Sequence, residues 1–234
     1  MVKFLSGNDA ELIFNYLDDN CSALLSAVTE FYPDCYLENG VFAMQYEENT
    51  PASLICHGGS FSLVFTSEKS DFNELLFTAG GKIHSPNILL LPKTGEYFLL
   101  KKSVVPVQNS IPENNCKYED FRTVLGLNES VETVNLQCLF KKGCAVPFVF
   151  AENGENAGVG MIVNSDEYAV ISHVFVKEEF RRNGVGTQLV KNLLKRSESE
   201  NVYLLSEKNN LEFYGRLGFT PVLTVYKYNS EKGK

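Results

Sequence analysis

A short glycine turn between an apolar strand and an amphipathic helix is the feature that most constrains the fold. The turn runs from Arg181 to Thr187 and reads Arg-Arg-Asn-Gly-Val-Gly-Thr. The apolar residues Val174 to Val176 precede it, and apolar positions recur every three to four residues from Val185 to Leu194. This spacing predicts a helix that starts inside the turn. Strand, glycine turn and helix are therefore consecutive.

The turn has the chemistry of an anion site. Gly184 and Gly186 expose backbone amides without a shielding side chain, and the following helix points its positive end at the same place. A diphosphate fits this arrangement. The sequence lacks the Gly-Lys-Ser/Thr ending of a nucleotide P-loop and the third glycine of a dinucleotide fingerprint, which disfavours ATP and NAD. Two glycines before a helix also occur in ordinary strand-to-helix connections. The flanking residues must therefore distinguish an anion-binding turn from such a connection.

Those flanking residues resemble the GNAT acetyltransferase superfamily. Arg181, Gly184 and Gly186 match its signature Arg/Gln-x-x-Gly-x-Gly/Ala. A second family motif, an aromatic-Tyr pair followed by Leu-Gly-Phe, matches the stretch from Phe213 to Phe219. The resemblance extends from about Val146 to Tyr228. It implies an α/β (α+β) fold with a mixed, mostly antiparallel sheet flanked by helices, and an acyl-CoA-dependent N-acyltransferase that uses acetyl-CoA.

The resemblance also implies which residues hold the cosubstrate. Backbone amides of the turn would bind the CoA diphosphate, and the strand before it would pair with the pantetheine arm. Asn210 and Glu207 depart from the Ala and Asn that the family commonly has there. The implied cofactor-binding residues are Val174, Phe175, Val176, Arg181, Arg182, Asn183, Gly184, Val185, Gly186, Thr187 and Asn210.

Two catalytic candidates follow. Tyr214 matches the position of the family's general acid, although a packed aromatic on its helix is the alternative. His173 precedes the cofactor strand, and its ordinary pKa near 6.5 suits a base that takes a proton from an amine. A hydrogen-bonded structural role is the alternative for His173, and Ser172 and Glu167 are weaker substitutes as the base. A thiol nucleophile, Cys144 for example, is disfavoured because no base pattern accompanies the cysteines.

Helices and strands alternate along the whole chain. Asp71 and Glu74 form a capping-box pattern at the start of one helix, and Asn153-Gly154 is a hairpin signal. The expected helices lie at 9–32 (two short helices), after 71, at 118–125, around 131–140, from 185 and at 211–217. The expected strands lie at 41–46, 52–56, 61–65, 88–91, 97–100, 147–151, 158–163, up to 176, at 202–205 and at 223–228.

This order predicts two domains. Residues 1–105 form a smaller, degenerate GNAT-like α/β domain, 106–117 a linker, and 118–234 the GNAT acetyltransferase domain. The first half has the element order of the opening of the second half, but contains nothing that resembles Arg-x-x-Gly-x-Gly.

The formal charge of −8 is unevenly distributed. Residues 1–116 contain 6 Lys and Arg against 14 Asp and Glu, whereas residues 117–234 contain 15 of each kind. A chain without basic clusters lacks the footprint of a nucleic-acid-binding protein. The acidic half would attract a cationic amine, or it is only a solvated surface.

The remaining features narrow the class of protein. The six cysteines are scattered without metal-ligand spacing, so we expect reduced thiols and no metal. No run approaches the roughly 20 apolar residues that a membrane helix needs, which favours a cytoplasmic protein with no membrane partner. The expected partners are acetyl-CoA and a small-molecule amine or other amino-group acceptor, and a homodimer is left open. The alternatives are an acyl-CoA-binding regulator without activity and, less favoured, a nucleotide-dependent enzyme.

Overall fold

A computed structural model describes residues 1–5, 9–29, 41–57, 62–89, 91, 93–106, 116–126 and 131–229, without the side chains of 41, 131–135 and 138. Contacts divide the chain into two compact units. Unit 1 comprises Met1–Leu99, Leu205–Leu211 and Pro221–Lys234, and unit 2 comprises Leu100–Leu204 and Glu212–Thr220.

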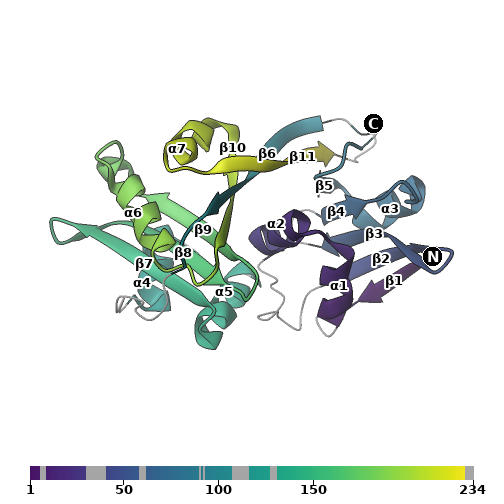
Figure 1. Cartoon of the computed structure of the whole chain (residues 1–234), viewed down its shortest axis with the longest axis horizontal. Helices are drawn as coiled ribbons and strands as arrows, with labels where there is room; N and C mark the ends of the chain where they lie inside the picture. Colours follow the sequence, from purple (N-terminus) through teal and green to yellow (C-terminus); the bar gives the residue numbers. More distant parts are fainter. Residues whose placement is uncertain are drawn as a thin grey trace. The chain divides into compact units, whose positions relative to one another are not determined.

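The elements follow one another in a repeated order (Figure 1). The first series is β1 (Val2–Leu5), α1 (Ala10–Tyr16), α2 (Asp19–Thr29), β2 (Val41–Glu47), β3 (Thr50–His57), β4 (Ser62–Thr66), α3 (Phe72–Ala79) and β5 (Lys82–Ser85). The second series is β6 (Lys93–Ser103), α4 (Tyr118–Leu125), α5 (Val131–Lys142), β7 (Ala145–Glu152), β8 (Glu155–Asn164), β9 (Ala169–Val176), η2 (Glu178–Phe180), α6 (Val185–Leu194), β10 (Asn201–Glu207), η3 (Lys208–Asn210), α7 (Leu211–Arg216) and β11 (Thr220–Asn229).

In unit 1 the strands lie in the order β1-β2-β3-β4-β5-β11. Neighbours are antiparallel except for β4 and β5, which are parallel. Ile55 and Val64 pack with Leu75 of α3 and Ile83 of β5 in one core cluster. Side chains alternate along a strand, so the intervening residues of β2 to β4 point to the opposite face. Those residues are also buried, and α1 contacts β3.

One predicted strand is wrong. Residues 88 and 89 are not in a strand, and Ile88 is 82% exposed. The strand lies earlier, at Lys82–Ser85, where Ile83 is fully buried between β4 and β11. Pro86 follows this strand directly. Proline has no backbone N–H, so it cannot donate a hydrogen bond to a neighbouring strand. The apolar run after Pro86 was therefore a poorer strand signal than the short segment before it.

In unit 2 the strands lie in the order β10-β9-β8-β7. The pairs β7–β8 and β8–β9 are antiparallel, and β9 and β10 are parallel. Helix α6 lies across β7, β8 and β9 (Figure 1). Gly160 makes this close approach possible, because a Cβ there would lie 2.7 Å from Leu193 Cδ1 of α6. Both faces of β8 are buried, and α4 contacts β7 and β8 while α5 contacts β7.

The structure confirms the mixed α/β fold. The order of three antiparallel strands, a helix and a parallel strand occurs twice, as β2-β3-β4-α3-β5 and as β7-β8-β9-α6-β10. The predicted hairpin is also present, but its loop is shorter than the predicted strands 147–151 and 158–163 implied, because Glu152 pairs with Glu155. Asn153 and Gly154 have positive φ angles of 55° and 83°, as a two-residue turn of this type requires.

The compact units differ from boundaries drawn along the sequence. The sequence predicted that the final strand belongs with residues 118–234. In the structure, β11 from Pro221 onward belongs to unit 1, where Tyr226 to Asn229 pair with β5. Tyr228 of this strand is buried, donates to Asn87 O at 3.2 Å and accepts from Leu89 N–H at 3.1 Å. The last strand of the second series therefore belongs to unit 1.

Two further observations concern the chain as a whole. Cys144 is disulfide-bonded, which corrects the expectation that all six cysteines are reduced, while Cys21, Cys56 and Cys116 are free. A disulfide forms between cysteines that tertiary folding brings together. The positions of the cysteines along the sequence therefore did not predict it. Among the described helices, none is long and apolar enough to cross a membrane.

Candidate active site

The predicted glycine turn connects η2 to α6 and has an unusual backbone. Arg182 has a φ of 65° and Gly184 a φ of 82°, so two residues of the turn are left-handed. Glycine adopts this conformation without steric cost. Gly184 is the N-cap of α6, so the helix starts inside the turn, as the sequence pattern predicted.

The first amides of α6 are not used by the helix itself. Its first turn closes with a bond from Gln188 N–H to Gly184 O, at 3.0 Å. No side chain caps the N-terminus, and the first turn contains no acidic residue. The N–H groups of Val185, Gly186 and Thr187 therefore keep the positive end of the helix open to an anion.

The strand that leads into the turn is fixed by an arginine. Arg181 donates from Nε to Val176 O at 3.0 Å. Its guanidinium is exposed, as is that of Arg182. Two cationic side chains thus flank the open amides, and the bond from Arg181 holds the end of β9 against the turn.

Strand β9 parts from β10 before it reaches the turn. The two strands pair at only two positions among the described residues, Val202 with Ala169 and Tyr203 with Val170. β9 continues to Val176, so its last residues have no β10 partner there. The predicted pantetheine-binding residues Val174, Phe175 and Val176 lie in this unpaired part.

His173 is the position where β9 is distorted. The register with β8 shifts between Val159 and Met161, so that two residues of β9 lie opposite Gly160. His173 has a φ of 53°, rare for a residue with a side chain. Such bulges change the direction of a strand. The distortion coincides with the divergence from β10, and no sequence signal indicated it.

The His173 ring is half-buried and oriented by two neighbours. Its Nδ1 lies 2.9 Å from Ser172 Oγ, and its ring meets Phe121 of α4 edge-on at 6.1 Å between centroids. Burial lowers the pKa of His173 below its ordinary value of 6.5. The imidazole is therefore neutral at pH 7 and able to accept a proton. Phe121 was not predicted as a site residue.

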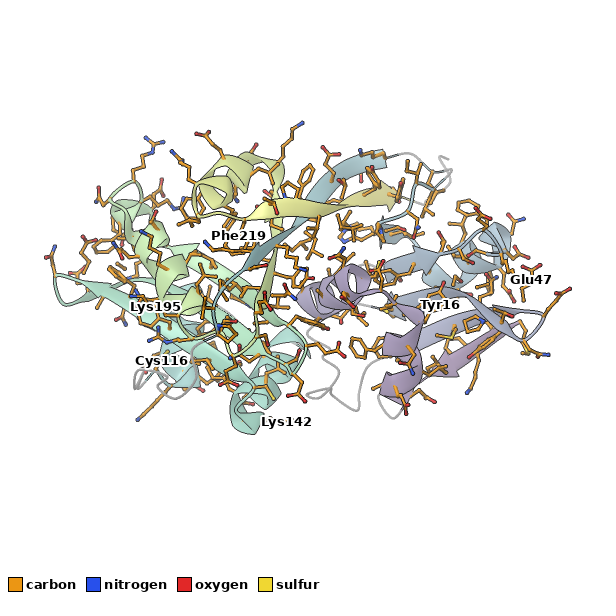
Figure 2. The ribbon with its side chains drawn as sticks, viewed as in Figure 1. Tyr16, Glu47, Cys116, Lys142, Lys195 and Phe219 are labelled. Carbon is orange, nitrogen blue, oxygen red and sulfur yellow. The ribbon has the colours of Figure 1, made fainter. Side chains whose placement is uncertain are left out.

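Helix α7 brings the second motif to the turn. The ring of Phe213 lies 3.4 Å from where a Cβ on Gly186 would be, so α7 packs directly beside the start of α6. Tyr214 is 9% exposed and contacts Phe213 and Phe219 edge-on, at 4.9 and 5.9 Å. Figure 2 labels Phe219, which follows α7.

The Tyr214 hydroxyl keeps its proton. Burial raises the pKa of Tyr214 above 10.0. Within the described part of the chain, no group forms a hydrogen bond to this hydroxyl. The Leu-Gly-Phe motif fixes the helix end, because Phe219 N–H donates to Tyr214 O at 3.1 Å and Lys102 Nζ donates to Leu217 O. Lys102 was missed, since an alternating strand pattern does not single out one lysine.

The structure thus groups most of the predicted residues in unit 2. The turn, the end of β9 and Phe213 of α7 are adjacent. Asn210 ends η3, directly before α7, and is exposed. Glu167 is also exposed, and Ser172 contacts His173. Among the described residues, no three His, Cys, Asp or Glu side chains gather as a metal site.

Comparison with known proteins agrees with this geometry. Residues 116–219 match the model of the Acetyltransferase (GNAT) family. The second half of the chain therefore contains a region that is similar to the GNAT family. An uncharacterized N-acetyltransferase of Bacillus subtilis (strain 168), YobR, is 31% identical over 85 residues. The match covers 34% of this chain and only 34% of that relative.

Solved structures resemble the chain over most of its length. An acetyltransferase of the GNAT family from Colwellia psychrerythraea has a TM-score of 0.56 at 12% identity, and the match covers 98% of this chain and 99% of that one. A tandem GNAT protein from the clavulanic acid biosynthesis pathway has a TM-score of 0.53 at 11% identity, with full coverage of both chains. At such identities the likeness concerns the fold, and the second comparison agrees with the two repeats.

Proposed function

We propose that this protein is an acetyl-CoA-dependent N-acetyltransferase that transfers an acetyl group to a primary amine within a ternary complex. The observation that carries the proposal is the open N-terminus of α6, preceded by left-handed Gly184 and flanked by Arg181 and Arg182. The GNAT match of residues 116–219 supports it.

The diphosphate of the cosubstrate would lie on the amides between Arg181 and Thr187. A helix terminus offers about half a positive charge, and each charge-assisted amide bond contributes roughly 1.5 to 3 kcal/mol. The end of β9 pairs with β8 but has no β10 partner among the described residues, so its free side provides backbone groups for the pantetheine arm at Val174 to Val176. Asn210, which directly precedes α7, stays a proposed cofactor-binding residue by its position in the second motif.

Bound acetyl-CoA supplies an activated acyl group, and the chain positions it. Holding both reactants in place removes much of the cost of their encounter, with effective molarities on the order of 10^5 M for well-oriented groups. The reaction then needs one group to take a proton from the amine and one to give a proton to the departing thiolate.

Tyr214 is the proposed acid. Its raised pKa keeps the phenol protonated at neutral pH, and its hydroxyl has no partner among the described residues. His173 is the proposed base, directly or through water. Its lowered pKa keeps the imidazole neutral, and an alkyl amine with a pKa around 10 must lose a proton before attack.

Calorimetry and a thiol-release assay test the proposal together. Acetyl-CoA should bind to the full chain, and at least one member of a panel of primary amines should release free CoA thiol. The absence of binding heat with acetyl-CoA contradicts the site. Binding without thiol release from any amine favours the alternative, a regulator that binds acyl-CoA without transferring the acyl group.

A further inference from the structure

Helix α7, which carries the proposed acid Tyr214, is too short to be stable without contacts from the rest of the fold. It has only six residues, Leu211–Arg216. A helix of this length is marginal in water by itself, so tertiary contacts must hold it. Tyr214 is 9% exposed. The contacts that fix the end of α7 therefore also fix the position of the Tyr214 ring.

The chain turns sharply directly after α7. Gly218 has a φ of 86°, and its N–H donates to Gly215 O at 2.9 Å. The N–H groups of Leu217 and Phe219 both donate to Tyr214 O, at 3.0 and 3.1 Å. The Phe219 ring, labelled in Figure 2, meets the Tyr214 ring edge-on at 5.9 Å between centroids. The turn therefore contacts Tyr214 through its backbone and through its side chain.

Lys102 of β6 holds this turn from outside the helix. Its Nζ donates to Leu217 O, a carbonyl at the end of α7 that the N–H groups of the helix cannot reach. A Cβ on Gly218 would lie 3.0 Å from Lys102 Nζ, so the glycine of the Leu-Gly-Phe motif also leaves room for the ammonium group. The C-terminus of a helix carries partial negative charge, which a cation stabilises. The half-buried Lys102 thus supplies both a donor and a positive charge.

The other cations near this turn have different partners. Arg216 in the last turn of α7 pairs with Glu212 on the same helix, with 3.7 Å between Nη1 and Oε1. Their side chains are 71% and 85% exposed, so solvent weakens this pair. Lys101 Nζ lies 5.3 Å from the centre of the Tyr203 ring on β10. Successive side chains of a strand point to opposite faces, so Lys101 and Lys102 reach different neighbours.

We propose that Lys102 is a positioning residue for acyl transfer: through Leu217 O it holds the turn after α7, and this turn holds the Tyr214 hydroxyl where it can protonate the departing thiolate. The inference rests on the proposed function, in which Tyr214 is the acid. Proton transfer requires hydrogen-bond distance between the two heavy atoms, and a displacement of about 1 Å can lower the rate about 100-fold. Loss of Lys102 should therefore lower turnover. Cosubstrate binding should persist, because the amides proposed to bind the diphosphate lie at the start of α6.

Replacing Lys102 by methionine is the first test. Lys102→Met keeps an unbranched side chain and removes the donor and the charge. In the thiol-release assay, kcat should fall about tenfold, and the affinity for acetyl-CoA by calorimetry should stay within about threefold of the wild type. Lys102→Arg keeps a charged donor and should recover most of the turnover. Lys101→Met, the matched control on the same strand, should keep the wild-type kcat. An unchanged kcat in Lys102→Met overturns the proposal.

A double-mutant cycle with Tyr214→Phe separates positioning from a general structural role. The Tyr214→Phe variant has no phenol to misplace, so adding Lys102→Met to it should leave kcat unchanged. A residue that only stabilises the fold would lower kcat by the same factor in both backgrounds, because independent effects on the barrier add. Equal reductions in the two backgrounds overturn the proposal. A wild-type kcat in Tyr214→Phe overturns it as well, because Lys102 then has no acid to position.

A measurement without turnover distinguishes failure of this proposal from failure of the proposed function. The chain has 11 tyrosines, and in protein labelled at the tyrosine Cζ the NMR signal of Tyr214 is the one that Tyr214→Phe removes. Burial raises the pKa of Tyr214 above 10.0. In Lys102→Met the loosened turn should expose the ring, so this pKa should fall toward 10.0, whereas Lys101→Met should leave it raised.

The two kinds of failure then give different results. If no amine releases thiol, the proposed function is wrong, and the pKa of Tyr214 still decides whether Lys102 fixes this ring. The same Tyr214 pKa in the wild type and in Lys102→Met overturns the positioning role, even where the wild type turns over an amine.

Discussion

Helices α3 and α6 occupy the same place in the two repeats, each after an antiparallel meander and before a parallel strand, yet their N-termini are built in opposite ways. At α3, Asp71 accepts from Asn73 N–H at 3.0 Å and from Glu74 N–H at 3.2 Å. At α6, left-handed Gly184 provides no side chain, and no acid follows in the first turn. One terminus is satisfied by its own chain, and the other is left for an anion.

The strand pairs before these two helices also differ, in the regularity of their register. The register between β3 and β4 is continuous, whereas the register between β8 and β9 shifts at His173. In unit 1, Gln45 is buried and donates to Glu74 Oε2 at 2.7 Å, which fixes the start of α3 through side chains. A shared fold therefore leaves an open helix terminus in one repeat and a self-satisfied structural element in the other.

Converting the start of α6 into that of α3 should have the largest effect. Gly184→Asp places a carboxylate where it can accept from the first amides of α6 and repel a diphosphate. We expect acetyl-CoA affinity, measured by calorimetry, to fall about 1,000-fold, since two or more charge-assisted bonds are lost. Gly184→Asn adds a similar side chain that tolerates the left-handed backbone without charge, and should lose less. If both variants bind acetyl-CoA as tightly as the wild type, the open N-terminus of α6 does not bind the diphosphate.

Removing the proposed acid should affect turnover alone. Tyr214→Phe keeps the ring contacts with Phe213 and Phe219 and deletes the hydroxyl. We expect kcat in the thiol-release assay to fall about 100-fold, the usual order for one acid-base group, with unchanged affinity for acetyl-CoA. Tyr226→Phe in unit 1 is the control and should keep full activity. An unchanged kcat in Tyr214→Phe assigns this tyrosine to packing.

The pH profile should report His173. The base is active when neutral, so kcat/KM should fall as pH drops through a pKa below 6.5. In His173→Gln we expect roughly tenfold lower activity at pH 7.5 and loss of this acid limb. The free energy of unfolding should also fall as pH drops. Below pH 6.5, His173 binds a proton more readily in the unfolded chain than in the folded one, where its ring is buried. An unchanged acid limb in the variant would exclude His173.

Removing the cap of α3 should have the smallest effect. Asp71→Ala leaves two amides unsatisfied and should lower the free energy of unfolding by about 1 kcal/mol, measured by urea denaturation. Acetyl-CoA should bind with wild-type affinity and one site per chain. Glu198→Ala, an exposed acid in unit 2, serves as a comparison for stability. A changed affinity in Asp71→Ala would mean that the first repeat contributes to cofactor binding.

Local patterns predicted local structure well. The glycine turn, the Asp71 cap and the Asn153-Gly154 hairpin each depend on a few adjacent residues whose backbone preferences leave few alternatives. The same holds for the Phe213-Tyr214 helix and its Leu-Gly-Phe end. The strand at 88–91 failed because a short apolar run does not say whether a neighbouring strand will accept it.

The sequence by itself determined that the start of α6 would be open and that Tyr214 would follow at a fixed distance along the chain, because these are properties of adjacent residues. Only the tertiary structure decided the bulge at His173, the pairing of β11 with β5, the disulfide of Cys144 and the contact of Lys102 with the end of α7. Each of these depends on contacts between residues far apart in sequence, and such contacts follow from packing and register rather than from local preference.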